Sequence, residues 1–254
     1  MLGWLTGAAV LGGAGAYSYG AMAPQSQLFG ASFARGDNPR QLALTYDDGP
    51  NDSCTLRLLE VLAKHGVKAT FFLIGRYVHS RPAIARRIAE AGHAVGNHTY
   101  SHPNLVFTSL QRLRRELEIC ERVLTETIGD HARLFRAPFG AKRPAVMRTV
   151  HNMGFMPIKW SVTCYDWKAT TADRVEQHAV RQIRGGDLIL MHDGDHAQMG
   201  ADRSHTVEAT ERLIRRYHDQ GYEFVTIPQM MNKGDEEPSK EETLSTAAET
   251  LKPS

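Results

Sequence analysis

The sequence predicts an α/β fold built on a parallel sheet. Between residues 35 and 231, seven short strand-like runs alternate with six amphipathic helical stretches, which is typical of β–α units joined in a parallel sheet. Nearly every helical stretch ends at a glycine, where a left-handed conformation lets the chain turn back. The strand-like runs are mostly apolar, as expected where helices cover the sheet. An open doubly wound sheet and a barrel both fit this pattern.

The first half of the domain supplies three strands and three helices. We expect strands at 42–46, 69–74 and 93–97. We expect helices at 56–65, 82–91 and 110–127, which end at Gly66, Gly92 and Gly129.

The second half repeats the scheme with four strands and three helices. We expect strands at 133–135, 155–161, 188–191 and 222–227, the last of them stopped by Pro228. We expect helices at 144–153, 172–183 and 207–219, which precede Gly154, Gly185 and Gly221.

The composition is that of a globular protein with a sizeable core. The chain has 254 residues, of which 42% are hydrophobic and 23% charged, with a formal net charge of +2. No basic stripe appears, so we expect no nucleic-acid partner. The three cysteines, Cys54, Cys120 and Cys164, are far apart and form no disulfide framework, and Cys120 fits a helical core position.

Three segments differ in composition. Residues 1–34 hold no charged side chain and are rich in glycine and alanine, whereas 35–231 carry the alternating pattern and 232–254 are polar without an apolar period. We expect the first segment to be an export signal or an uncleaved membrane anchor, with membrane association through residues 1–23 and a location in the cell envelope rather than the cytoplasm. A packed or flexible soluble arm is the alternative. The polar tail is expected to be disordered.

Ionisable residues fall at the ends of five predicted strands. They are Asp47 and Asp48 after the first strand, His98 and His102 after the third, Arg136 after the fourth, Asp166 after the fifth and His192 after the sixth. In a βα-barrel these strand ends share one face, where the chemistry is located. The sequence therefore predicts one pocket lined by carboxylates and imidazoles.

Two imidazoles and one carboxylate form a three-ligand set of the kind that holds catalytic zinc. A turn at the aspartates and a surface helix bearing His98 and His102 are the simpler alternatives. A zinc protease would carry glutamate immediately after the first histidine, and Thr99 stands there instead. One aspartate would remain free as a general base that Arg136 could orient, and His192 could serve as a general acid unless it is merely a core histidine.

Five segments together resemble the polysaccharide deacetylases, also called the NodB homology or carbohydrate esterase family 4 domain. They are Thr45-Tyr46-Asp47-Asp48-Gly49-Pro50, His98-Thr99-Tyr100-Ser101-His102, Arg136-Ala137-Pro138-Phe139-Gly140, Asp166-Trp167 and Leu190-Met191-His192. They occur in the family's order between about residues 40 and 230. Two positions depart from the pattern: Tyr46 replaces a commoner phenylalanine, and Thr163 stands where many members carry an aspartate.

The resemblance implies an irregular (β/α)7 barrel and a role for each site residue. Asp47 would be the general base, Arg136 would orient it, and His192 would be the general acid, held in its working protonation state by Asp166. The implied metal ligands are Asp48, His98 and His102, and the implied substrate contacts are the N–H of Phe139 and the walls formed by Trp167 and Leu190. The implied cofactor is one divalent ion, Zn2+ before Co2+ or Ni2+.

The resemblance also implies the reaction. The expected enzyme removes N-acetyl, or alternatively O-acetyl, groups from an amino-sugar polymer or oligomer such as chitin oligomers or peptidoglycan. Two other functions stay open: deformylation or deacetylation of a lipid-linked amino sugar, and carbohydrate binding without catalysis. Related hydrolases of ring amides generally lack the histidine pair, so His98 and His102 argue against that activity. The sequence makes no prediction of the oligomeric state.

Overall fold

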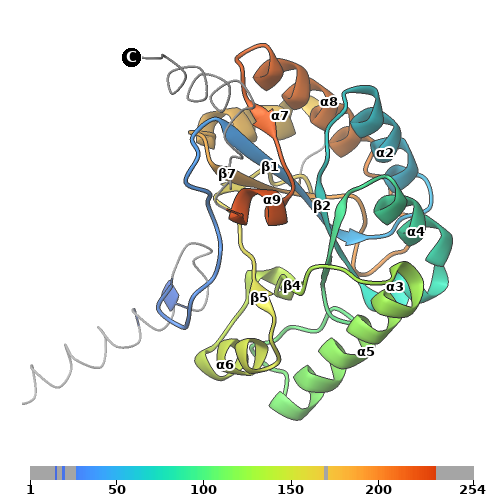
Figure 1. Cartoon of the computed structure of the whole chain (residues 1–254), viewed down its shortest axis with the longest axis vertical. Coiled ribbons are helices and arrows are strands. Elements are labelled where there is room, and N and C mark those ends of the chain that lie inside the picture. Colours follow the sequence, from blue (N-terminus) through green and yellow to red (C-terminus); the bar gives the residue numbers. More distant parts are fainter. Residues whose placement is uncertain (1–14, 16–18, 21–26, 169–170, 233–254) are drawn as a thin grey trace, which may run out of the picture.

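A single curled parallel sheet forms the centre of the molecule (Figure 1). The computed structural model describes residues 15, 19–20, 27–168 and 171–232. Most of the predicted export or anchor segment and the polar tail from residue 233 lie outside these residues. Within the described part, no helix has the length and apolar character needed to cross a membrane.

The sheet of the described residues has eight strands in the order β5-β4-β3-β2-β1-β7-β6, with β8 beside the start of β1. The strands are β1 (Gln41–Gly49), β2 (Thr70–Leu73), β3 (Ala94–Asn97), β4 (Leu134–Phe135), β5 (Met156–Pro157), β6 (Val162–Thr163), β7 (Asp187–His192) and β8 (Glu223–Phe224). All the paired strands are parallel. The predicted parallel α/β fold is confirmed, and the barrel that the resemblance implies takes the form of a curled half-barrel.

The prediction of one strand over 155–161 is wrong, because this segment passes from one edge of the sheet to the other. Its start pairs with β4 as β5, and its end continues into β6 beside β7. Between them the N–H of Lys159 donates to the carbonyl of Phe33 at 2.8 Å, outside both neighbouring strands. The segment predicted as one strand therefore forms β5 and then leads into β6.

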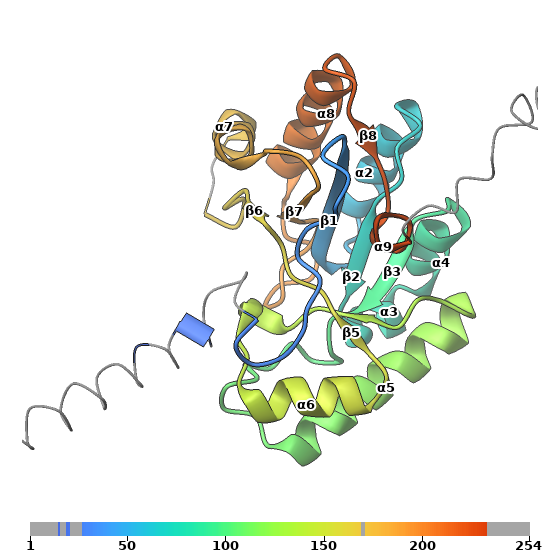
Figure 2. The same cartoon turned by 60° about the vertical axis from the view of Figure 1, so that its left-hand side comes forward.

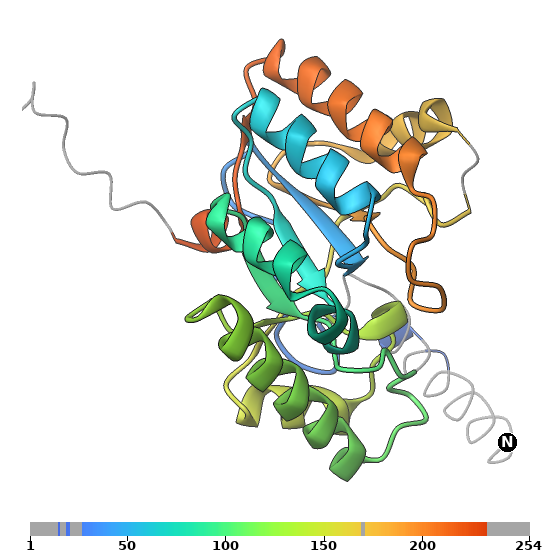
Figure 3. The same cartoon turned by 90° about the vertical axis from the view of Figure 1, so that its right-hand side faces the viewer.

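Helices cover the outside of the sheet (Figures 1 and 3). They are α2 (Cys54–Lys64), α3 (Gly75–Ser80), α4 (Pro82–Glu90), α5 (Leu110–Ile128), α6 (Pro144–Asn152), α7 (Ala172–Gln182), α8 (Ser204–His218) and α9 (Ile227–Met231). Six of these lie within a few residues of the predicted helices. The short α3 and α9 and a 3-10 turn at Pro138–Gly140 were not predicted. Pro228 lies in the first turn of α9, where a missing N–H costs nothing, so it does not end a strand.

Side chains of β1 alternate between the two faces of the sheet, and this alternation determines which of them pack against the helices. Leu42, Leu44 and Tyr46 pack against the layer of α2 and α8, which lie side by side in Figure 3. Ala43 lies in the second core cluster, inside the curl. Successive side chains of a strand point to opposite faces, so Thr45 and Asp47 also face the inside. Figure 2 shows the other end of the sheet, where α5 and α6 lie beside β4 and β5.

Candidate metal centre and active site

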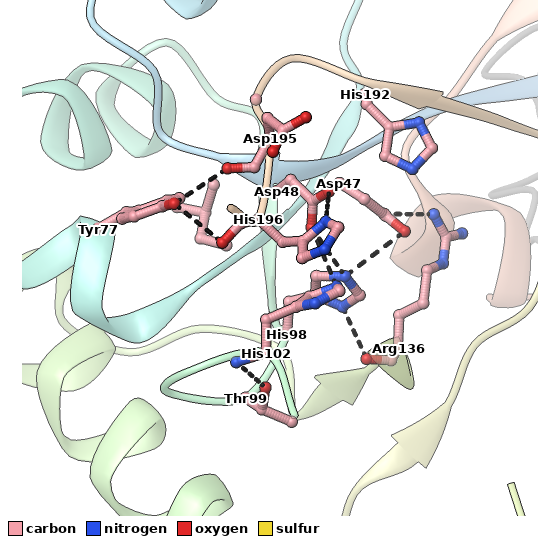
Figure 4. A network of polar contacts seen from close by, with 12 residues as sticks. Asp47, Asp48, Tyr77, His98, Thr99, His102, Arg136, His192, Asp195 and His196 are labelled. Carbon is pink, nitrogen blue, oxygen red and sulfur yellow. Dashed lines mark hydrogen bonds and ion pairs between the residues drawn. The ribbon is translucent and has the colours of Figure 1, made fainter. Parts of the chain in front are cut away.

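A cavity of about 430 Å³ opens at the carboxyl ends of the strands. Eight of the ten predicted site residues line it: Asp47, Asp48, His98, His102, Phe139, Trp167, Leu190 and His192. The other two, Arg136 and Asp166, are fully buried. Arg136 hydrogen-bonds to Asp47, and Asp166 hydrogen-bonds to His192. The structure therefore brings all the predicted residues together. Figure 4 shows Asp47, Asp48, His98, His102, Arg136 and His192 among them.

Local backbone geometry aims several of these side chains. Among the described residues, the non-glycine residues with positive φ are Asp48, Thr99, His102, Phe139 and Tyr165, with values between 53° and 71°. Such conformations cost free energy and gather where a site requires them. Three of the five, Asp48, His102 and Phe139, line the cavity, and Thr99 lies in the loop between the two histidines of the site. The pairing of β1 with β2 shifts register between Asp47 and Gly49, so the chain bulges at Asp48 and its carboxylate turns away from the regular pleat.

The donor atoms of Asp48, His98 and His102 fit a divalent metal ion. The Oδ1 atom of Asp48 lies 3.5 Å from Nε2 of His98 and 3.2 Å from Nε2 of His102. Two ligand atoms of a tetrahedral zinc ion are separated by about 3.3–3.5 Å, given bonds of roughly 2.0–2.2 Å. The same Oδ1 atom is buried and accepts no hydrogen bond. A cation in this position would satisfy it, and the three residues form a buried triad of potential ligands.

Both imidazoles are prepared to act as neutral ligands. The Nδ1–H of His98 donates to the carbonyl of Arg136 at 2.8 Å, so Nε2 keeps its lone pair toward Asp48. Burial, followed by the proximity of His98, lowers the pKa of His102 to about 3. Burial alone would raise the pKa of Asp48, but the His196 and His98 imidazoles outweigh it and hold that pKa well below its usual range. Asp48 and His102 thus favour the deprotonated forms that a metal requires of its ligands, and His98 is oriented with Nε2 toward them.

Asp47 is held by a buried guanidinium. The NH1 group of Arg136 donates to Oδ1 of Asp47 at 2.8 Å and to the hydroxyl of Thr45 at 2.8 Å. The guanidinium also lies 4.1 Å above the ring centre of Phe72. Its NH2 group donates to the carbonyl of Lys159 at 3.1 Å. These contacts fix the guanidinium, and through it they fix the carboxylate of Asp47 inside the curl.

His192 and Asp166 form a second pair across the cavity. Nδ1 of His192 lies 2.8 Å from Oδ1 of Asp166, and the backbone N–H of His192 donates to Oδ2 at 2.6 Å. The hydroxyl of Thr206 donates to Oδ2 at 3.0 Å. Burial alone lowers the pKa of His192, but the Asp166 carboxylate outweighs it and raises the pKa to about 9. The imidazole is therefore protonated at neutral pH, with Nδ1–H directed at Asp166.

His196 also belongs to the site, although sequence reasoning did not single it out. Its ring stacks on His102 with centroids 4.5 Å apart, and its Nδ1 lies 3.8 Å from Oδ2 of Asp48. Its backbone carbonyl accepts a hydrogen bond from the Tyr77 hydroxyl at 3.1 Å, which ties its loop to α3 (Figure 4). A signal was present in the sequence, because His192 and His196 repeat the spacing of His98 and His102.

Thr163 shows what replaces the aspartate that many family members carry there. Its hydroxyl accepts a hydrogen bond from the indole N–H of Trp160 at 2.8 Å, and Trp160 lines the cavity. Its backbone N–H and carbonyl both bond to the side chain of Gln182. The threonine therefore orients a cavity wall that sequence reasoning also missed.

Comparison with known proteins assigns the family. The family model described as polysaccharide deacetylase matches residues 34–158. A peptidoglycan-N-acetylglucosamine deacetylase of Bacillus cereus is 34% identical over 210 residues, which cover 83% of this chain and 75% of that protein. A chitooligosaccharide deacetylase of Sinorhizobium fredii is 36% identical over 200 residues, which cover 76% and 93%. The chain belongs to the polysaccharide deacetylase family.

Solved structures agree with this assignment. The crystal structure of the peptidoglycan N-acetylglucosamine deacetylase Bc1960, in complex with a hydroxamate-type benzamide, superposes with a TM-score of 0.72 at 35% identity. The match covers 78% of this chain and 91% of that one. The predicted family, its barrel-type fold and the deacetylase class of enzyme are thereby confirmed, as is a site of divalent-metal type. The identity of the ion and the role of each residue stay predictions.

Proposed function

We propose that this protein is a Zn2+-dependent deacetylase of N-acetylglucosamine-containing glycans. The observation that carries the proposal is the convergence of the Asp48–His98–His102 triad, the Asp47–Arg136 pair and the Asp166–His192 pair on one cavity. The relatives named above, which act on peptidoglycan N-acetylglucosamine and on chitooligosaccharides, support this class of substrate. Co2+ or Ni2+ would suit the same ligands.

The ion would supply Lewis acidity: it would polarise the acetamide carbonyl and lower the pKa of a bound water. Asp47 is the base that takes the proton of the attacking water, and Arg136 orients its carboxylate. The N–H of Phe139 has no hydrogen-bond acceptor in the described part of the chain, which leaves it available to the developing oxyanion.

His192 completes the reaction as the general acid. Its protonated imidazole donates to the amine nitrogen as the carbon–nitrogen bond breaks, because an unprotonated amide nitrogen is a very poor leaving group. Asp166 keeps this proton on the ring at neutral pH. Leu190 and Trp167 line the cavity with apolar surface that suits the acetyl methyl group. The products are acetate and a free amino sugar.

A substrate panel tests the proposal. The purified chain is expected to release acetate from N-acetylglucosamine oligomers or peptidoglycan fragments, and not formate from a formylated lipid-linked amino sugar. Asp47→Asn should lower kcat by about 10²–10⁴-fold, since it removes the base but leaves the metal ligands in place. Asp219→Asn, an exposed substitution of the same kind, should leave the rate unchanged. An undiminished rate in Asp47→Asn would contradict the assigned base.

We propose a location in the cell envelope, where such glycans occur. The uncharged composition of residues 1–34 supports export or anchoring. Fractionation of cells that express the full chain checks the point: we expect the protein in the membrane or exported fraction. Recovery in the cytoplasmic fraction alone would contradict it.

A further inference from the structure

A second pocket, of about 340 Å³, is lined by Tyr165, Lys168, Arg174 and His178. Three of these four side chains carry nitrogen donors, and the fourth carries a phenol. Among the described residues, no carboxylate lines the pocket. The donor set is therefore of the kind that receives an anion rather than a cation.

The acidic residues of α7 are directed away from this pocket. Asp173 pairs with Arg212 of α8, and Glu176 pairs with both Arg212 and Arg216. Within the described residues, Arg174 makes no ion pair, and the ammonium of Lys168 lies 5.8 Å from the ring centre of Tyr165. The positive charges beside the pocket are thus not neutralised by the helix that carries Arg174.

Aromatic rings connect this pocket to the active site. The ring of Trp167 lies edge-on to His192, with centroids 5.1 Å apart, and 5.5 Å from the ring of Tyr165. Tyr165 in turn contacts the ring of His178 at 5.1 Å. Trp167 and Tyr165 are 42% and 40% exposed, so their faces remain accessible to a sugar. The exposed indole therefore lines the active-site cavity and contacts Tyr165, which lines the second pocket.

The backbone of Tyr165 has a strained conformation. Its φ of 53° lies in the left-handed region, which an aromatic residue with a β-carbon rarely adopts. It does not line the active-site cavity, unlike Asp48, His102 and Phe139, and it lines the second pocket instead. Strained residues gather at functional sites, which supports a binding role for this pocket.

We propose that the second pocket binds a carboxylate on the sugar next to the one that is deacetylated. Arg174 and Lys168 would hold the carboxylate by charge-assisted hydrogen bonds, while Trp167 packs against the intervening sugar. The preferred substrate is then an acidic glycan, such as a peptidoglycan strand without stem peptides, whose muramic acid residues carry a free carboxylate, rather than neutral chitin. This inference rests on the proposed function and names its substrate class.

Binding measurements test the pocket without requiring turnover. Quenching of tryptophan fluorescence reports the Kd of a tetrasaccharide of alternating N-acetylglucosamine and N-acetylmuramic acid with free carboxylates. Its methyl ester serves as the uncharged control of the same shape, and chitotetraose as the neutral glycan. We expect the free acid to bind more tightly than its ester, and this preference to shrink as ionic strength rises from about 0.05 to about 0.5 M.

Variants assign the effect to the pocket. Arg174→Ala should raise the Kd of the free acid by about three- to five-fold, the size of a partly exposed charge contact, and leave the Kd of the ester unchanged. Lys168→Ala should behave in the same way. Arg181→Ala removes an exposed cation from the same helix and should change neither value.

Two results would overturn the inference: equal binding of acid and ester, including no binding of either, or an equal effect of Arg174→Ala and Arg181→Ala. Failure of the proposed function is a separate outcome, since it would show as selective binding of the acid without release of acetate.

Discussion

At the scale of single residues, the site depends on pairs of side chains that hold each other in position. Asp48 has an orphan oxygen facing two imidazole nitrogens, Asp47 is held by Arg136, and His192 by Asp166. Each pair was predicted because its members stand in short segments at strand ends. His196 was not, although it repeats the spacing of the first histidine pair, and Trp160 was not, because it was read as part of one strand over 155–161.

The Asp166–His192 pair makes the rate depend on pH in a predictable direction. The pKa of His192 is raised to about 9 because the Asp166 carboxylate outweighs burial. Above that pH the imidazole loses the proton that it must donate, so kcat/KM should fall. Asp166→Asn removes the carboxylate and leaves the burial, so this alkaline limb should move to lower pH by about 1–3 units.

The pH profile of kcat/KM for both proteins checks this expectation. Asp219→Asn serves as the control, since it makes the same change at an exposed position of the surface. An alkaline limb that stays in place in Asp166→Asn would mean that another group supplies the proton.

At the scale of elements, helices hold the loops that carry the ligands. Glu116 of α5 is buried and accepts hydrogen bonds from the N–H and the hydroxyl of Ser101, at 2.8 and 2.7 Å. Ser101 lies directly before His102. The helix therefore anchors the irregular segment between His98 and His102. A change at Glu116 should then affect both the folding free energy and the affinity for the metal.

Glu116→Ala is expected to cost about 1–3 kcal/mol of folding free energy, because it leaves the backbone N–H of Ser101 without a partner. It should also weaken metal binding, because the loop that carries His102 loses its anchor. Chemical denaturation and metal titration measure the two effects. Glu118→Ala, at an exposed position of the same helix, should change neither. Equal behaviour of the two variants would show that α5 does not position the loop.

Sequence patterns predicted the longer helices and strands well. They failed where contacts between distant parts of the chain determine the secondary structure. The helices at 110–128 and 204–218 carry clear periodicity, so they were predicted to within a few residues. The short α3 has too few residues to show a period. The run 155–161 reads as one strand, but its ends pair with opposite edges of the sheet. Such a choice of partner depends on the closure of the whole sheet.

At the scale of the whole molecule, the curl of the sheet creates the active site. Residues from β1, from the loops after β3, β4 and β6, and from β7 meet because parallel strands end on one face. Helices α2 and α8 bury the outer face of β1, which keeps Asp47 and Asp48 rigidly placed. The central claim is that this framework holds one divalent ion on which deacetylation depends.

Metal titration coupled to acetate release tests that claim most directly. The chain is stripped by chelation, and Zn2+ is added back while bound metal per chain and the rate on N-acetylglucosamine oligomers are followed together. We predict one ion per chain, a rate that rises in proportion to it, and an affinity weakened by more than about tenfold in His102→Ala. A full rate in the metal-free chain, or unchanged affinity in His102→Ala, would contradict the account.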